Sequence, residues 1–408
     1  MQITVKAPGI LFGKIALPAS KSISNRALIL NALSEGGPIL ENLAKCDDTN
    51  VMVTALGSND IIKNIGAAGT SMRFLTAYLS LLPGEWELTG TERMKNRPVA
   101  ILVDALINLG AEITYTEKPG FPPLRISGKH IEGGKIEVDG SISSQYLSAL
   151  MMAGPKMKNG LVLQIKGSLI SRPYAEMTLK MMEIYGVKAE WIENEITIPA
   201  QNYKPTKLKI ESDWSAASYW YEMLCLAEKG EIFLEGLESN SLQGDSRVAK
   251  LFDDLGIKTE YQKEGVKLTK EGNPVDTFCA DLSDQPDLAQ TLVMTCLIKG
   301  IKFRITGLQS LKIKETDRII ALITESGKLG FDINECENNG LEWRGFHCES
   351  DSPAIIETYE DHRMAMAFAP AAFTKNDIVI NNPEVVSKSY PYYWKDLEAI
   401  GFTIKNLE

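Results

Sequence analysis

The sequence predicts an α/β protein built from six repeats of alternating strands and helices, with three repeats in each of two domains. Two recurring patterns predict the repeats. One is a helix start, in which small or hydroxylated residues precede an apolar run; the other is a helix end, usually Leu or Ile before Gly, followed by a β-prone stretch. The length predicts the division, because 408 residues exceed what one hydrophobic core usually fills.

The helix-start pattern occurs six times. A typical copy is Ser143-Ser144-Gln145, followed by the largely apolar run 146–150. One copy alone is weak support for a helix, and the regular recurrence is what gives the pattern weight. The six copies begin near Ser20, Gly69, Ser143, Asp213, Pro286 and Asp361.

The helix-end pattern also occurs six times, and its copies alternate regularly with those of the helix-start pattern. Gly is expected just past a helix because it accepts positive φ without a Cβ clash. Each end follows its start by roughly 40 residues, and most successive starts are roughly 70 residues apart. The six ends are Gly57, Gly110, Gly186, Gly256, Gly330 and Gly401.

Short alternating stretches between the helices predict strands, for example at 136–138, 207–210 and 265–269. The interval from Ser20 to Gly69 is about 20 residues shorter than the others. We therefore expect the first repeat to lack a pair of strands. The fourth start, at Asp213, places a domain boundary near that residue and leaves three repeats on each side.

Composition excludes several classes of protein. The apolar share of 44% and the charged share of 24% are ordinary for a globular protein, and the net charge is −10. Basic residues are not interleaved with aromatic residues, which argues against a nucleic-acid partner. We find no signal peptide and no apolar stretch of about 18 residues, so we expect no membrane partner and a cytoplasmic protein.

The cysteines and histidines do not predict a metal site. The six cysteines are scattered without a C-x-x-C pair, and we expect reduced, buried thiols, with disulfides as the alternative. The three histidines, His130, His347 and His362, are far apart and show no ligand spacing. Neither the ATP-binding nor the dinucleotide-binding glycine motif occurs, so no cofactor is expected.

Cations near the helix starts predict a site for small anions. A helix N-terminus offers unpaired N–H groups and a partial positive charge to a phosphate or carboxylate. Lys21 and Arg26 flank the first start, and Arg73 follows Gly69, where the absence of a side chain leaves room for an anion. A solvated surface role for any single arginine, and a purely conformational role for Gly69, stay open as alternatives.

Two carboxylates stand out among these cations. Lys314, Glu315, Asp317 and Arg318 are crowded into what we expect to be one or two helical turns, and Asp287 lies at another helix start. Catalysis by Asp287 and Glu315 is the hypothesis of interest. The alternatives are an N-cap role for Asp287 and an exposed salt bridge for Glu315.

Seven motifs, taken in order, resemble the enolpyruvyl transferase family and, within it, the 5-enolpyruvylshikimate-3-phosphate synthases. The resemblance spans nearly the whole chain. It implies a two-domain inside-out α/β barrel of six βαβαββ repeats, three per domain. The implied domains are 20–212, with the shortened first repeat, and 1–19 plus 213–408, with the active site in the interdomain cleft. The motifs are PASKSISNR at 18–26, AGTSMR at 68–73, NRP at 96–98, GSISSQ at 140–145, SRPY at 171–174, KETDR at 314–318 and DHRMAM at 361–366.

The resemblance also implies an activity. The family moves the enolpyruvyl group of phosphoenolpyruvate to the 5-hydroxyl of shikimate 3-phosphate and releases phosphate, in the shikimate pathway that leads to chorismate and the aromatic amino acids. The chain would therefore be a transferase with two small anionic substrates as its partners, no cofactor and no metal. We expect it to be a monomer.

The resemblance carries site residues over to this sequence. Asp287 is implied as the base at the 5-hydroxyl, and Glu315, with Lys21, as the group that handles the proton at the methylene carbon. Shikimate 3-phosphate is implied to contact Lys21, Ser22, Arg26, Ser143, Ser144, Gln145, Ser171 and Lys314. Phosphoenolpyruvate is implied to contact Lys21, Gly69, Arg97, Gln145, Arg318, Arg363 and Lys388.

Two other functions remain as alternatives. The sister transferase acts on UDP-N-acetylglucosamine and usually has a cysteine in a mobile loop of its N-terminal domain, whereas here no cysteine occurs between Cys46 and Cys225. A non-catalytic anion-binding scaffold is the second alternative. The presence of Lys21, Asp287 and Glu315 together argues against it.

Overall fold

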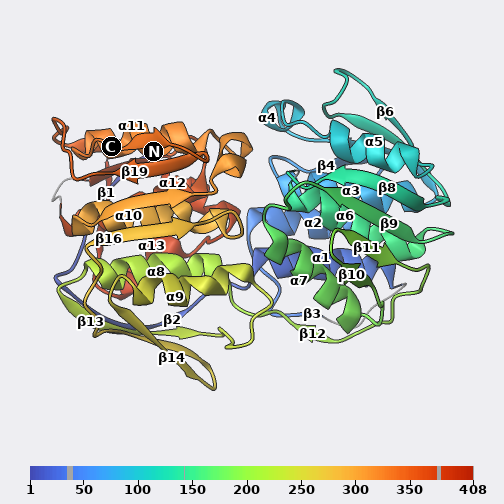
Figure 1. Cartoon of the computed structure of the whole chain (residues 1–408). Coiled ribbons are helices and arrows are strands. Elements are labelled where there is room, and N and C mark those ends of the chain that lie inside the picture. The colour runs from blue at the N-terminus through green and yellow to red at the C-terminus, as the bar shows by residue number, and fades with distance from the viewer. Residues whose placement is uncertain (35–39, 142, 375–377, 408) are drawn as a thin grey trace. The chain divides into compact units, whose positions relative to one another are not determined.

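The structure is a computed structural model that describes residues 1–34, 40–141, 143–374 and 378–407. The chain forms two units, both drawn in Figure 1. Unit 1 contains residues 1–18 and the chain from residue 211 onward, and unit 2 contains residues 19–210. Unit 2 is therefore one continuous segment inserted into unit 1. One motif position, Ile142, lies outside the described residues.

The predicted helix starts are confirmed. Side chains of Ser20, Ser143, Asp213 and Asp361 each cap a helix by accepting a hydrogen bond from a backbone N–H of its first turn. The start near Pro286 is a short 3₁₀ turn, η3 (Pro286–Leu288), which leads into a helix. The six helices are α1 (Lys21–Leu33), α3 (Gly69–Leu81), α6 (Ser144–Ala153), α8 (Trp214–Leu226), α10 (Ala289–Lys299) and α12 (His362–Phe368).

Five of the six predicted helix ends have the expected glycine with positive φ, namely Gly110, Gly186, Gly256, Gly330 and Gly401. They follow α5 (Ala100–Asn108), α7 (Arg172–Ile184), α9 (Val248–Asp253), α11 (Arg318–Lys328) and α13 (Tyr393–Ala399). A helix also ends at Gly57, but this glycine does not have the expected positive φ. That residue is the last residue of α2 (Asp47–Gly57) itself, and the chain leaves the helix through Ser58 in an extended conformation.

Two four-stranded sheets of unit 2 show the repeat clearly. In each, the first two strands are parallel with a buried helix between them, and the last two form an antiparallel hairpin after a second helix. This order is βαβαββ. The strands are β4 (Ile62–Asn64), β5 (Gly84–Thr89), β6 (Glu112–Tyr115) and β7 (Leu124–Gly128), then β8 (Gly134–Asp139), β9 (Leu161–Lys166), β10 (Glu190–Ile192) and β11 (Glu195–Ile198). The short helix α4 (Glu92–Lys95) follows β5.

Unit 1 contains three four-stranded sheets of the same kind among its described residues. Strands from the N-terminus complete two of them: β1 (Gln2–Lys6) pairs with the last strands of the chain, and β2 (Ile10–Ala16) pairs with β13. The other strands are β13 (Lys229–Glu235), β14 (Ile257–Gln262), β15 (Gly265–Lys270), β16 (Thr277–Asp281), β17 (Lys302–Thr306), β18 (Asn334–Cys336), β19 (Gly340–Trp343), β20 (Ala354–Ile356), β21 (Ile378–Asn381) and β22 (Thr403–Leu407).

The remaining sheet of the described chain is smaller. It consists of β3 (Leu40–Glu41) and β12 (Leu208–Lys209), which pair in parallel. This sheet belongs with α1 and α2, the helices of the first repeat, which the sequence predicted to be shortened. The antiparallel hairpin found in the other sheets has no counterpart here among the residues that the structure describes.

Helices, rather than sheets, form the centre of the core in unit 1. Every residue of α10 from Ala289 to Leu297 is buried, and α8 is buried on almost all sides. A helix that is enclosed on every face needs apolar or internally bonded residues all round. The strands instead alternate between buried and exposed residues, as β13 and β17 do. The sheets therefore cover the helices, and α8, α10 and α12 lie next to one another in unit 1 (Figure 1).

The structure also tests the predictions about membranes and thiols. Within the described ranges, no helix is both long enough and apolar enough to cross a bilayer. The cysteines are unpaired, as expected. The expectation that they are buried is wrong for Cys279, on the outward face of β16, and for Cys348, in a loop, and Cys336 is only partly buried.

Glu222 is an unusual member of the unit 1 core. It lies in α8 and is fully buried, and neither side-chain oxygen has a hydrogen-bond partner among the described residues. Burial raises the pKa of Glu222 well above its ordinary value of 4.5. Folding therefore favours the protonated form of this carboxyl, whereas the unfolded chain ionises it at lower pH.

We expect Glu222→Gln to stabilise the protein, increasingly as pH rises above 4.5. A raised pKa in the folded state favours folding fully below the unfolded value and loses that contribution as pH rises. Replacing the acid with an amide removes this decrease in stability with pH, and should add about 1–3 kcal/mol to the free energy of unfolding at pH 8. Urea unfolding at pH 5 and pH 8 measures the effect. Glu228→Gln, at an exposed position after the same helix, is the control and should change neither value.

Candidate active site

The helix starts of unit 1 bring one carboxylate into contact with three cations. Asp287 lies in η3, Arg318 is the first residue of α11, and Arg363 lies in the first turn of α12. The Asp287 carboxylate is 3.2 Å from Arg318 Nη1, 2.8 Å from Arg363 Nη2 and 3.5 Å from Lys314 Nζ. These residues come from two successive repeats, and the sequence alone did not show that they touch.

Arg318 is the centre of this cluster. Its side chain is only 2% exposed, and Nε donates to Asp361 Oδ2 at 2.6 Å. Nη2 donates to Glu315 Oε2 at 2.9 Å and to Asp361 Oδ1 at 3.2 Å. On its other side, Glu315 Oε1 is 3.0 Å from Lys388 Nζ, which lies at the end of η6 (Pro383–Lys388). Such a network fixes the planar guanidinium in one orientation.

Opposite charges dominate the ionisation of these groups. Burial acts to raise the pKa of Asp287, but the charges of Arg363, Lys314 and Arg318 outweigh it and hold that pKa well below its ordinary value. Burial acts to lower the pKa of Arg318, whereas Asp361, Glu315 and Asp287 raise it above its ordinary value. Both side chains are therefore ionised throughout the physiological range.

The structure corrects one expectation about these residues and contradicts two of the alternatives. Lys314, Glu315 and Asp317 do not share helical turns with Arg318: the short η4 (Gln309–Ile313) ends before them, and Asp317 caps α11. Asp287 does not cap a helix, because its carboxylate is bound to cations. Glu315 is not on the surface, since its side chain is 13% exposed.

In unit 2, the first helix start carries Lys21 and Arg26. Lys21 Nζ is 3.1 Å from Asp48 Oδ2, and both side chains are largely buried. Arg26 is buried and bonds to three elements: Nε donates to Thr178 Oγ1 at 2.7 Å, Nη2 to Ser148 Oγ at 2.9 Å, and Nη1 to the Ser22 carbonyl at 3.0 Å. Burial lowers the pKa of Arg26 to about 10, so it remains a cation at neutral pH. Arg26 therefore links α1 to α6 and α7.

Gly69 lies directly against a guanidinium. A Cβ at this position would lie 2.6 Å from Arg97 Nη1 and 2.9 Å from Arg97 Cζ, both too close. The next turn of the same helix holds Arg73, which donates to the carbonyls of Gly69 at 3.1 Å and Pro98 at 3.2 Å. Glycine at this helix start is thus explained by the space that Arg97 occupies, and not by a positive φ.

The remaining unit 2 residues of the predicted site also lie at helix starts. Ser143 caps α6, and Gln145 Nε2 donates to Thr70 Oγ1 at 3.2 Å, so the starts of α3 and α6 are neighbours. Ser144 is buried. Ser171 precedes α7 with φ of 54°, a conformation that costs energy for a residue with a Cβ and is frequent at functional sites.

Sequence reasoning missed several partners of these residues. Asp48 follows the start of α2 and pairs with Lys21, and Asp361, predicted only as a helix start, also supports Arg318. Tyr219 Oη accepts a hydrogen bond from Arg363 Nη1 at 3.4 Å. An Asp near a helix start could have suggested the first two. Tyr219, inside a buried helix, gave no such signal.

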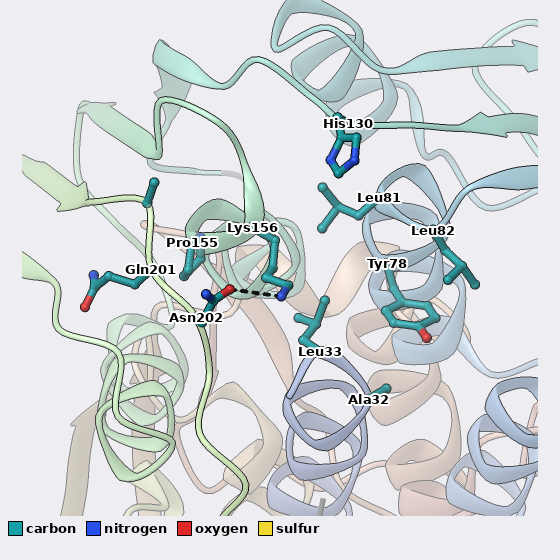
Figure 2. A pocket seen from close by; sticks show the side chains of 11 residues that line it. Ala32, Leu33, Tyr78, Leu81, Leu82, His130, Pro155, Lys156, Gln201 and Asn202 are labelled. Atoms are coloured by element: carbon teal, nitrogen blue, oxygen red, sulfur yellow. Dashed lines mark hydrogen bonds between the residues drawn. The ribbon is translucent and has the colours of Figure 1, made fainter. Parts of the chain in front are cut away.

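A cavity of about 530 Å³ in unit 2 lies away from this site. Figure 2 shows Ala32, Leu33 and Leu81 from the ends of α1 and α3 beside it, with Tyr78 and His130. Lys156 Nζ donates to Asn202 Oδ1 at 3.2 Å at its edge. The cavity is thus lined by the C-terminal ends of helices whose N-terminal ends carry the predicted site residues. None of the residues that line it belongs to the predicted site.

Neither unit shows a metal centre in its described part. Among the described residues, no group of three or more His, Cys, Asp or Glu side chains is placed to hold a metal ion. Both clusters contain several cations whose side chains are largely buried, among them Lys21, Arg318 and Arg363, and such groups are suited to bind anions.

The family model described as EPSP synthase (3-phosphoshikimate 1-carboxyvinyltransferase) matches residues 5–58 and 57–397. The chain belongs to this family. A 3-phosphoshikimate 1-carboxyvinyltransferase of Bacteroides fragilis strain YCH46 is 52% identical over 406 residues, which cover 99% of both chains. A relative of the same name from Photobacterium damsela subsp. piscicida is 36% identical and covers 98% of this chain and 99% of its own.

Solved structures confirm the predicted fold class. Two EPSP synthase structures from Acinetobacter baumannii match with TM-scores of 0.78 and 0.79 at 21% identity. The first match covers 99% of this chain and all of the solved chain. The protein is thus a transferase of the shikimate pathway, which moves the enolpyruvyl group of phosphoenolpyruvate to shikimate 3-phosphate.

Proposed function

We propose that the clusters described above carry out this transfer, with Asp287 as the base at the 5-hydroxyl of shikimate 3-phosphate. The observation that carries the proposal is the set of contacts from Arg318, Arg363 and Lys314 to the Asp287 carboxylate. Arg318 and Arg363 are suited to hold the carboxylate and phosphate of phosphoenolpyruvate beside the base, and Lys314 is suited to contact shikimate 3-phosphate there.

The reaction itself sets the requirements. Protonation of the methylene carbon makes the adjacent carbon electrophilic, and the 5-hydroxyl attacks it while losing its proton to a base. The tetrahedral intermediate then collapses as phosphate leaves and a proton departs from the methyl group. An acid, a base and cations for two anionic substrates suffice for these steps.

Anionic substrate is expected to strengthen Asp287 as a base. In the ligand-free protein, Arg363, Lys314 and Arg318 hold the pKa of Asp287 well below its ordinary value, which makes it a weak proton acceptor. A bound phosphate and carboxylate would offset those positive charges and raise the pKa. Asp287 would then gain basicity when substrate is present.

We propose that Glu315 handles the proton at the methylene carbon, with Lys21. The Glu315 carboxylate is held between Arg318 and Lys388, with 13% of its side chain exposed. Lys21 faces Asp48, which would act as a proton partner when the lysine ammonium contacts a substrate. Coupled groups of this kind share their protons, so the two residues are proposed as a pair.

For shikimate 3-phosphate, we propose contacts with Lys314 and with the helix starts of unit 2. The starts of α3 and α6 are adjacent, joined by Gln145 and Thr70, and helix N-termini are suited to bind a phosphate. The unit 2 residues proposed for this substrate are Lys21, Ser22, Arg26, Ser143, Ser144, Gln145 and Ser171, whereas Gly69 and Arg97 are proposed, with Lys388, for phosphoenolpyruvate.

We further propose that the two units are the domains of the enzyme and that both clusters serve one reaction. We also propose a monomer in the cytoplasm. The support is the family's chemistry, which involves two small water-soluble substrates. Size-exclusion chromatography with light scattering at micromolar concentration tests the monomer, and a dimer mass would contradict it.

Phosphate release from phosphoenolpyruvate tests the activity. We expect release with shikimate 3-phosphate as acceptor and none with UDP-N-acetylglucosamine, the acceptor of the sister transferase. Product mass spectrometry should show the enolpyruvyl ether. Release with the nucleotide sugar alone would favour the sister activity, and release with neither acceptor would favour a non-catalytic scaffold.

A further inference from the structure

Asp245 is a second carboxylate that lies behind the unit 1 cluster. It belongs to η2 (Gly244–Arg247) and is 3% exposed. Its carboxylate accepts a hydrogen bond from Ser215 Oγ, in the first turn of α8. No part of the proposed reaction uses Asp245, although it is buried and close to residues that the reaction does use.

One face of α8 connects Asp245 with the proposed base. Ser215 and Tyr219 are four residues apart and so lie on the same face of the helix. Tyr219 Oη accepts a hydrogen bond from Arg363 Nη1 at 3.4 Å, and the same guanidinium donates from Nη2 to Asp287 Oδ2 at 2.8 Å and from Nη1 to the Asp287 carbonyl at 3.1 Å. Both η2 and η3 pack against α8.

We propose that Asp245 is a positioning residue for enolpyruvyl transfer. Its ionised carboxylate partly offsets the positive charge of Arg363, and this makes Asp287 a stronger base. This inference rests on the proposed role of Asp287. The charge of Arg363 acts to lower the pKa of Asp245 as well as that of Asp287, so a charge on one carboxylate reduces the stabilisation that Arg363 gives to the other. With Asp245 protonated, Arg363 stabilises the ionised form of Asp287 fully; with Asp245 ionised, Asp287 binds a proton more readily.

The charges around Asp245 favour a change of ionisation within the working pH range. Burial raises the pKa of Asp245 to about 6, helped by the charges of Asp287 and Asp213 and opposed by Ser215 and Arg363. Asp213 caps α8 through Ala216 N at 2.9 Å. The cation of Asp245's own turn, Arg247, is directed elsewhere, to Gln285 Oε1 and the Asp281 carbonyl.

The test compares pH profiles of kcat and KM for the intact enzyme, with phosphoenolpyruvate and shikimate 3-phosphate, from pH 5 to 9. In the unmodified protein, we expect kcat/KM for phosphoenolpyruvate, which reports the ionisation of the free enzyme, to rise through an inflection near pH 6. Asp245→Asn should remove that inflection and lower the plateau of kcat about three- to tenfold, because proton transfer follows the strength of the base. Both KM values should stay within twofold.

Ser215→Ala gives a signature that a structural role would not produce. Loss of the hydroxyl donor removes a bond that favours the ionised carboxylate, so the inflection should move to higher pH. The exposed Asp254→Asn is the matched control and should leave the profile unchanged. Because the substrates titrate identically with every variant, the differences between profiles belong to the protein.

The outcomes separate this inference from the proposed function. An unaltered profile in both Asp245→Asn and Ser215→Ala, with Asp287→Asn inactive, overturns the role of Asp245 alone. Near-normal turnover by Asp287→Asn overturns the proposed base and this inference with it. Should Asp245→Asn fail to fold, the shift in Ser215→Ala decides, and an unmoved inflection there contradicts the inference.

Discussion

Replacing Asp287 with Asn is expected to lower kcat by about 10²- to 10⁴-fold, since the substitution removes a proton-transfer group and keeps its size. The fold should persist. Arg318 retains its bonds to Asp361 and Glu315, and Arg363 retains Tyr219 and the Asp287 carbonyl, which belongs to the backbone. Phosphate release at saturating substrate measures the loss, and urea unfolding checks the fold.

Asp276→Asn is the control for this prediction. Asp276 is an exposed carboxylate in the same part of the sequence, ahead of β16, and its replacement should leave kcat unchanged. A kcat of Asp287→Asn within about threefold of the unmodified protein would show that proton removal from the 5-hydroxyl occurs elsewhere. Glu315 would then be the next candidate for the base.

Gly69→Ala is expected to raise KM for phosphoenolpyruvate by about 10- to 100-fold, because the new Cβ would displace the Arg97 guanidinium by occupying the space 2.6 Å from Nη1. The clash is with the end of a flexible side chain, so the arginine moves and the backbone stays. We expect an unchanged free energy of unfolding and an unchanged affinity for shikimate 3-phosphate, measured by calorimetry.

Gly57→Ala is the matched control for Gly69→Ala. A Cβ at Gly57 would meet nothing within 4 Å, and this glycine also lies in a helix without positive φ. Its replacement should leave both KM values unchanged. If Gly69→Ala retains a normal KM for phosphoenolpyruvate, the Arg97 guanidinium beside Gly69 does not bind that substrate.

Local signals in the sequence predicted much of the fold. Capping residues such as Ser20 and Asp213 act within one helical turn, so their effect can be predicted from residues that are adjacent in the sequence. Glycines such as Gly110 and Gly256 report a backbone angle that other residues disfavour. The expected positive φ was wrong at Gly57, because glycine also occurs inside the last turn of a helix.

The site was less predictable because its contacts join distant parts of the sequence. Lys21 and Asp48 are 27 residues apart, and Arg363 and Asp287 are 76 residues apart. Their types suggested anion binding, but the pairs depend on how repeats pack. The charged residues from Lys314 to Asp317 also suggested a helix, but they form a non-helical connection between η4 and α11. In this connection Glu315 contacts both Arg318 and Lys388.

The pairing of β1 with β21 and β22 has a consequence for synthesis on the ribosome. Thr4 pairs with Lys405, so the first strand made must wait for nearly the last residues before its sheet exists. At typical elongation rates that delay is roughly 20–80 s. Unit 2, encoded entirely between these ends, can fold during the wait. A chain that ends after residue 210 and has left the ribosome should therefore already protect unit 2 from protease while β1 is still digestible.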